Sequence, residues 1–223
     1  MGANAAQRDV EIKTDRALVA GIFALPPIAF GLVIFAHGTG SGRLSSRNQF
    51  VARELQQARI ATLLLDLLTP EEEAIDERGG TLRFDVAMLA ARLEGAIDWS
   101  HAQPEANGLP IGLFGASTGA AAALIAAAHR PDDVRAVVSR GGRPDLAGSA
   151  LRQVKAPTLL IVGGNDPIVL QLNQDAAREL MAPVDFIVVP GATHLFPERG
   201  ALEQVARAAR EWFSKHLASA ARN

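Results

Sequence analysis

The amino-acid sequence predicts an α/β fold, in which a mostly parallel sheet carries helices on both faces. Three observations lead to this prediction. Short, unbroken apolar runs recur along the chain, as is typical of strands buried on both faces. Segments with helical apolar spacing lie between these runs, and an alternating stretch precedes them. The runs that we expect to be buried strands are residues 32–36, 61–65, 111–114, 134–138, 158–162 and 186–189.

The N-terminal segment is expected to form a hairpin of two antiparallel strands. Polar and apolar residues alternate at 10–12, the pattern breaks at 14–16, and a strand-like run resumes over 18–25. Alternation of this kind is typical of strands with one exposed face. The hairpin therefore precedes the buried part of the sheet.

Helical character is clearest in three later segments. Apolar residues recur every three or four positions from Leu82 to Ile97, and again from Leu202 to Leu217. Residues 117–129 are mostly alanine, which favours a helix and allows it to approach a sheet closely. A repeated strand–helix series of this kind builds a parallel sheet through right-handed crossovers.

Composition places the chain among globular proteins, and we expect residues 1–223 to form one domain, since 48% of them are hydrophobic. The 22 Lys and Arg residues are balanced by 24 Asp and Glu residues, so nothing indicates a nucleic-acid partner. Cysteine is absent, which excludes disulfides, a thiolate metal site and a cysteine nucleophile. No apolar run approaches the ~20 residues of a membrane helix, and no secretory leader is recognisable. We therefore expect a cytoplasmic protein of undetermined oligomeric state without a membrane partner.

Polar residues gather directly after the expected parallel strands, which is where α/β sheets place their ligand sites. Ser117, Asp166 and His194 each follow a different expected strand. Because the carboxyl ends of parallel strands meet at one edge of the sheet, these three side chains can come together. A serine, an aspartate and a histidine are the residue types of a nucleophile with its base and an orienting acid.

Ser117 lies in a G-x-S-x-G motif, between Gly115 and Gly119 and between a predicted strand and a predicted helix. A sharp strand-to-helix turn exposes a serine hydroxyl, but it crowds the backbone, and the two glycines relieve that crowding. The start of the helix also stabilises negative charge near the hydroxyl. We therefore predict that Ser117 is a nucleophile, the alternative being a helix start built from small residues.

His194 is predicted to be the base, because an imidazole with a pKa of about 6.5 can take the serine proton near neutral pH. Asp166 is predicted to accept the other ring N–H of His194 and to orient the ring. In its Asn-Asp-Pro turn, Asp166 could instead only cap the following helix. Asp145, which follows the strand at 134–138, is the other candidate for the orienting acid.

The glycine-rich segment 38–42 is predicted to contribute to an oxyanion hole. It lacks the Lys-Ser/Thr pair of a phosphate-binding loop. The backbone N–H groups of Thr39 and Thr118 would converge on a carbonyl oxygen as it becomes negative. His37 and Asp66 are expected to order this segment through hydrogen bonds.

Three arginines follow strands on the same side of the sheet, namely Arg43, Arg140 and Arg143. A planar guanidinium matches a carboxylate with two parallel hydrogen bonds, so Arg43 and Arg140 are candidate substrate-binding residues for an anionic ester. The alternative is that these arginines pair with Asp66, Asp145 or nearby glutamates and hold the loops in place.

The segment 69–81 is expected to cover the site as a charged, solvated loop, because acidic residues are concentrated in it. A cap domain is not expected, since only 18 residues, 139–156, separate two of the strand runs. A deep apolar tunnel for long lipid chains is not expected either.

Together these residues resemble the α/β-hydrolase superfamily, and within it the dienelactone-hydrolase-related branch with a serine nucleophile. The resemblance implies an eight-stranded, mostly parallel sheet with an antiparallel second strand, and a triad of Ser117, Asp166 and His194. Dienelactone hydrolases proper use a cysteine, which this chain lacks, so their substrate is not carried over. Similar domains occur fused to phosphoribosyltransferases. The segments that carry the resemblance are 37–43, 65–72, 114–120, 139–145 and 191–194.

The sequence therefore predicts a serine hydrolase, without metal or organic cofactor, that cleaves a small carboxylic ester or lactone through an acyl-enzyme. An acyltransferase or a thioesterase could use the same three residues. A non-catalytic α/β-hydrolase scaffold that binds a small ligand or a partner is the alternative from a different class. The fold alone does not decide among these functions.

Overall fold

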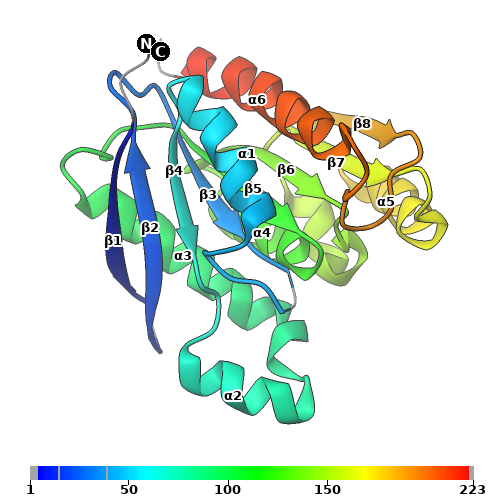
Figure 1. Ribbon diagram of the computed structural model, residues 1–223, viewed down its shortest axis with the longest axis horizontal. Helices are drawn as coiled ribbons and strands as arrows, with labels where there is room; N and C mark the ends of the chain where they lie inside the picture. The colour runs from blue at the N-terminus through cyan, green and yellow to red at the C-terminus, as the bar shows by residue number, and fades with distance from the viewer. Residues whose placement is uncertain (1–4, 15, 39, 221–223) are drawn as a thin grey trace.

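A computed structural model describes residues 5–14, 16–38 and 40–220. Eight strands form one sheet in the order β1-β2-β4-β3-β5-β6-β7-β8 (Figure 1). The strands are β1 (Ala6–Lys13), β2 (Leu18–Leu25), β3 (Leu32–Ala36), β4 (Ala61–Leu65), β5 (Ile111–Ala116), β6 (Val134–Arg140), β7 (Thr158–Gly163) and β8 (Val184–Val189).

Only the N-terminal part of the sheet is antiparallel, as predicted. β1 pairs with β2 as a hairpin, and β2 pairs with β4 in the antiparallel sense. All pairs from β4 across to β8 are parallel. The carboxyl ends of β3 and of β5 to β8 therefore open on the same edge of the sheet.

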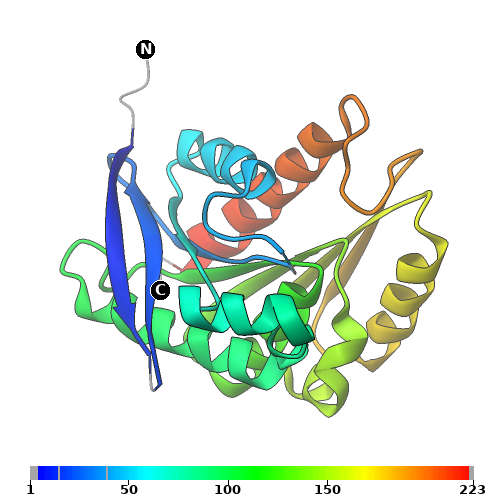
Figure 2. The same ribbon diagram turned by 60° about the horizontal axis from the view of Figure 1, so that its bottom comes forward.

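Helices cover both faces of the sheet (Figure 2). α1 and α6 pack against each other on one face, where Val51, Leu55 and Phe213 share a buried cluster with Val33 and Phe114 of the sheet. The other face carries α3, α4 and α5. The helices are α1 (Ser46–Gln57), α2 (Pro70–Gly79), α3 (Val86–Ala102), α4 (Thr118–His129), α5 (Pro167–Glu179) and α6 (Ala201–Ala220), with 3₁₀ segments η1 (Leu82–Phe84) and η2 (Pro144–Gln153).

The alanine-rich helix α4 lies at the centre of this second layer. Ten of its residues, from Thr118 to Ala127, are buried. It packs against α3, η2, β5 and β6, and small side chains are what allow contact with so many neighbours at once. The helix therefore holds its N-terminal end, which follows Ser117, in a fixed place at the carboxyl edge of the sheet.

Two sequence-based expectations are corrected by the structure. The segment expected to be a solvated loop contains a regular helix, α2, which Thr69 caps through a reciprocal capping box with Glu72. The last strand, β8, is not buried on both faces, because it lies at the edge of the sheet and its Val188 is 42% exposed. None of the described helices combines the length and apolarity needed to cross a membrane.

Candidate active site

Ser117 occupies a strained turn between β5 and α4. Its φ and ψ are 52° and −124°, a combination that residues other than glycine rarely adopt. A Cβ on Gly115 would lie 2.4 Å from Ala120 Cα, and one on Gly119 would lie 2.4 Å from the Ala36 carbonyl oxygen. The turn can form only because both flanking positions lack a side chain, as the motif predicts.

His194 and Asp166 meet across two loops. Asp166 follows β7 and His194 follows β8, and His194 Nδ1 lies 2.8 Å from Asp166 Oδ2. The other carboxylate oxygen, Oδ1, accepts a hydrogen bond from the Val169 N–H at 3.4 Å, so Asp166 also caps α5. Asp166 therefore both contacts His194 and caps α5. Asp145 is instead held by two hydrogen bonds from Arg143, at 2.9 and 2.7 Å.

Ser117 and His194 line the same pocket, which has a volume of about 190 Å³. Ser41, Arg47 and Arg140 also line it. Among the hydrogen bonds of the described residues, none joins Ser117 to His194. Hydrogen bonds in a catalytic apparatus are often long or poorly aligned before substrate binds, so this arrangement is compatible with proton transfer between them.

The glycine-rich loop is ordered by His37 and Asp66, as predicted. His37 Nε2 accepts a hydrogen bond from the Leu67 N–H at 2.8 Å, which places the ring proton on Nδ1, 3.0 Å from the Gly38 carbonyl oxygen. Burial lowers the pKa of His37 and favours this neutral form. The Asp66 carboxylate accepts the Arg43 backbone N–H at 2.7 Å and also pairs with the Arg43 guanidinium.

Thr118 is one of the two predicted donors to an oxyanion. Thr118 is buried and is the first residue of α4, and the N–H groups of a first helical turn point out of the helix start. Gly38 packs against Ser117, because a Cβ built on it would lie 2.7 Å from Ser117 Cβ. Thr39, the other predicted donor, lies outside the described residues.

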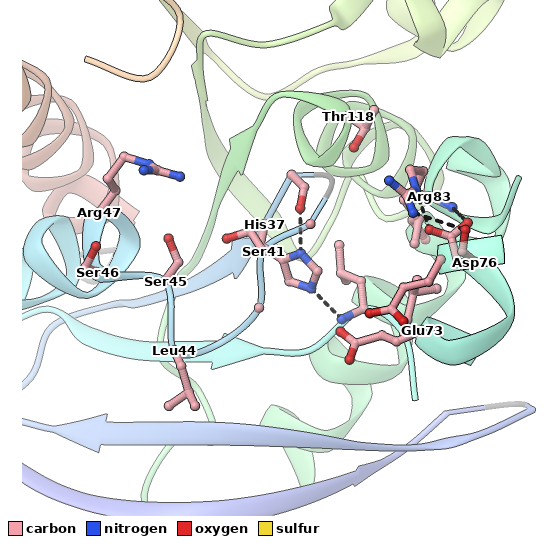
Figure 3. Close-up of a pocket in the computed structure, with 17 residues that line it drawn as sticks. His37, Ser41, Leu44, Ser45, Ser46, Arg47, Glu73, Asp76, Arg83 and Thr118 are labelled. Carbon is pink, nitrogen blue, oxygen red and sulfur yellow. Dashed lines mark hydrogen bonds and ion pairs between the residues drawn. The ribbon is translucent and has the colours of Figure 1, made fainter. Parts of the chain in front are cut away.

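A larger cavity of about 460 Å³ adjoins the pocket of Ser117 (Figure 3). Gly38, Ser41 and Arg47 line both spaces. The far wall comes from α2 and is acidic, since it carries Glu73, Asp76 and Glu77. Burial and the charges of Asp66 and Glu77 raise the pKa of Glu73. The small pocket thus has Arg47 and Arg140, whereas the larger cavity has these three carboxylates together with Arg47 and Arg83.

Ion pairs hold α2 over this cavity. The Glu72 carboxylate forms an ion pair with Arg92 of α3, with an N–O distance of 2.6 Å. The Arg92 guanidinium also donates a hydrogen bond to Thr14 Oγ1 at 2.9 Å. Asp76 is paired with Arg83 of η1, which also donates its backbone N–H to the same carboxylate at 3.1 Å. The cover is thus a helix attached to its neighbours through charged side chains.

The three arginines considered in the sequence have different surroundings in the structure. Arg140 lines the pocket of Ser117, whereas Arg43 is committed to Asp66 and Arg143 to Asp145. Arg43 lines neither the pocket of Ser117 nor the larger cavity, and its pairing with Asp66 agrees with the loop-holding alternative. Sequence reasoning misses Arg47, at the start of α1, because no strand end or motif marks it. Within the part of the chain that is described, no cluster of three or more His, Asp or Glu residues could hold a metal ion.

Comparisons with known proteins agree with this architecture. The model of the Dienelactone hydrolase family matches residues 48–219. The crystal structure of a dienelactone hydrolase from Anabaena variabilis is 53% identical in sequence, with a TM-score of 0.94 over 96% of this chain and 100% of that one. Est1E from Butyrivibrio proteoclasticus shares the fold, with a TM-score of 0.77 at 16% identity over 97% of this chain and 100% of that chain.

A curated relative carries a different name. A protein of Mycobacterium tuberculosis with the provisional name phosphoribosyl transferase is 54% identical over 209 residues, which are 94% of this chain and 46% of that protein. The chain thus spans about half the length of that relative.

Proposed function

Since the chain belongs to the dienelactone hydrolase family, we propose that it is a serine hydrolase that cleaves small carboxylic esters or lactones through an acyl-enzyme. The observation that carries the proposal is the 2.8 Å contact between His194 Nδ1 and Asp166 Oδ2. His194 also lines the pocket of Ser117. With Nδ1 engaged by the carboxylate, Nε2 is the nitrogen available to Ser117.

In the first half of the reaction, Ser117 Oγ attacks the substrate carbonyl carbon while His194 Nε2 takes the hydroxyl proton. The Asp166 carboxylate stabilises the imidazolium that results and keeps the ring oriented. Collapse of the tetrahedral intermediate breaks the bond to the leaving alcohol. His194 gives that alcohol the proton, and the acyl group remains on Ser117.

Negative charge develops on the carbonyl oxygen during this attack. We assign its stabilisation to the Thr118 backbone N–H, at the start of α4, and to that of Thr39 on the basis of its place in the sequence. The loss of one such donor typically raises the barrier by about 3–4 kcal/mol. The strained turn at Ser117 keeps hydroxyl and amide close to each other without rearrangement.

In the second half, water attacks the acyl group and His194 Nε2 takes its proton. The tetrahedral intermediate then releases the carboxylic acid, and His194 returns the proton to Ser117 Oγ. A lactone follows the same steps, but its alcohol and acid stay joined in one product. The serine replaces the cysteine of dienelactone hydrolases proper, so the dienelactone substrate is not part of the proposal.

The test is a panel of p-nitrophenyl esters, lactones and thioesters, with Ser117→Ala as the matched variant. We expect wild-type turnover of esters or lactones and a loss of at least about 10⁴-fold in Ser117→Ala. A consistent preference for thioesters would instead favour the thioesterase alternative. Absence of turnover across the whole panel would favour the binding scaffold, and a wild-type rate in Ser117→Ala would contradict the proposal.

A further inference from the structure

We propose that Arg47 and Arg140 form a binding subsite for a compact oxyanion, a carboxylate or a phosphate, carried by the substrate beside its scissile carbonyl. The inference rests on the proposed function and assigns a substrate class to the same site. Arg140 ends β6 and Arg47 stands in the first turn of α1, so two guanidinium groups from elements distant in sequence reach one pocket.

Arg140 is a buried charge without a counter-charge. It is only 6% exposed, yet no salt bridge among the described residues involves it, and its Nε has no hydrogen-bond partner. The hydrogen bond from its Nη2 to Asn48 Oδ1 is long, at 3.5 Å, and the ring of Phe196 lies 5.9 Å from its guanidinium carbon. A buried ionic group is costly unless it is paired.

The second arginine adds to this cost instead of relieving it. Arg47 also has a buried Nε without a partner. Burial and the neighbouring positive charge of Arg47 lower the pKa of Arg140 to about 10, so Arg140 remains charged at neutral pH. The two guanidinium groups share a pocket and, among the described residues, have no carboxylate between them. An anion bound in this pocket would offset their mutual repulsion and the cost of burying their charges.

Other arginines near the site show the contrast. Arg43 pairs with Asp66, and Arg143 pairs with Asp145. Arg92, which is even more buried than Arg140, pairs with Glu72. The two arginines that line the pocket of Ser117 are thus unlike these three, whose positive charge is already neutralised by the protein.

The backbone after Arg140 is shaped to bring it to the pocket. Gly141 has a φ of 50°, and a Cβ there would lie 3.0 Å from the His194 carbonyl oxygen. A Cβ on Gly142 would lie 2.0 Å from Ser139 Oγ. This glycine pair lets β6 end against the His194 loop, which places Arg140 beside both reacting side chains. Figure 3 shows Arg47 extending from the start of α1 toward the adjoining cavity.

A compact oxyanion fits the pocket better than a bulky one, because its volume of about 190 Å³ is shared with the reacting atoms. A planar guanidinium can donate two parallel hydrogen bonds to a carboxylate or phosphate, and the pair offers two such donors. The anion therefore lies on the part of the substrate nearest the scissile carbonyl, and the larger cavity receives the remainder of the substrate.

The first test compares kcat/KM for mono-p-nitrophenyl glutarate, which carries a free carboxylate, with its neutral methyl ester. We expect wild type to prefer the anionic ester by at least about tenfold, and Arg140→Gln and Arg140→Met to lose that preference. Arg47→Gln should lose part of it. Arg143→Gln, which removes an arginine already paired with Asp145, should keep the wild-type preference.

The second test measures binding without turnover. In Ser117→Ala, sodium glutarate or inorganic phosphate should raise the melting temperature above that in sodium chloride of equal ionic strength, and adding Arg140→Met should abolish this shift. The larger shift identifies the carboxylate or the phosphate as the preferred anion. Equal ester discrimination in wild type and Arg140 variants, or no shift with either anion, would overturn the subsite. A wild type that binds the anion but hydrolyses no ester would overturn only the proposed hydrolase.

Discussion

The turn that carries Ser117 and the helix that covers the site are built in different ways. The turn depends on the backbone: φ is positive at Ser117, and the glycines on either side have no room for a Cβ. The cover, α2, depends on side chains, because the Glu72–Arg92 and Asp76–Arg83 ion pairs attach it to α3 and η1. One region is held by sterics and the other by charge.

If the proposed function holds, this difference separates the residues that perform the reaction from those that select the substrate. A backbone arrangement that requires glycine at fixed positions can be recognised in the sequence as a short motif. An arrangement held by ion pairs between distant positions leaves no local motif, and many pairs of residues could provide it. We therefore expect changes in the turn to abolish function or folding, and changes in the cover to alter substrate affinity.

The largest expected effect comes from Asp166, the proposed orienting acid of His194. Asp166→Asn should lower kcat by about 10⁴-fold, because an amide favours the wrong tautomer of the ring. Asp145→Asn should lower kcat by less than about threefold, because Asp145 is paired with Arg143. Steady-state kinetics with one p-nitrophenyl ester decides the order. The reverse ranking would assign the role to Asp145.

Two helical glycines, one in each region, test the steric part of the comparison. Gly119→Ala should cost about 3 kcal/mol or more in unfolding free energy, since its Cβ would lie 2.4 Å from the Ala36 carbonyl oxygen. Gly79→Ala, in α2 with nothing within 4 Å, should instead gain about 0.5–1 kcal/mol. Denaturant titrations of both variants provide the measurement. Similar changes in the two variants would show that the turn is not sterically restricted.

The charged attachment of the cover is tested by Glu72→Gln. The change leaves Arg92 buried without a counter-charge, so α2 should open more often and KM should rise by roughly three- to tenfold with kcat within about twofold. Hydrogen exchange should lose protection over 70–79. Glu71→Gln, an exposed neighbour in the same helix, serves as the control. Unchanged KM and protection in Glu72→Gln would show that the ion pair does not hold the cover.

The smallest expected effect concerns His37, which connects the two regions through the glycine loop and Leu67. Burial lowers its folded-state pKa below the unfolded value of about 6.5, so protonation favours unfolding. The stability from neutral His37 is complete above that pH and is lost as pH falls toward the folded pKa, by up to about 1.4 kcal/mol per pH unit.

His37→Asn should remove this acid-dependent loss, as measured by urea titrations between pH 7 and pH 5. The matched variant His101→Gln, at an exposed position next to Asp133, should keep the wild-type slope. A wild-type slope in His37→Asn would assign the loss to other groups.

Much of the fold is predictable because burial on both faces leaves a local signature. The apolar runs of β3 and β4 match the structure at both ends, and the alanine-rich segment forms α4. The run in β8 wrongly predicts a fully buried strand, since an apolar run does not reveal that its strand ends the sheet. The high charge and weak apolar pattern of α2 wrongly predict a loop. The stability of α2 comes from the capping box and from Arg92, which is distant in sequence.

Some residues of the site are predictable from the strand pattern, and others depend on contacts between distant elements. Ser117, Asp166 and His194 follow strands, so the strand pattern alone is enough to bring them to one edge of the sheet. Arg43 follows a strand as well, and only the tertiary contacts pair it with Asp66. Arg47 follows no strand and belongs to no motif, so its approach to Arg140 depends on how α1 packs on the sheet. Such contacts arise from packing between distant elements, which a motif does not encode.

Whether Ser117 is an activated nucleophile is decided by its reaction with a fluorophosphonate probe at neutral pH. Intact-mass analysis should show one adduct per chain in wild type, with peptide mapping on Ser117. Ser41→Ala, which changes another serine of the same pocket, should still be labelled, whereas Ser117→Ala should not. An unlabelled wild type, or an adduct that persists in Ser117→Ala, would contradict a serine nucleophile at this position.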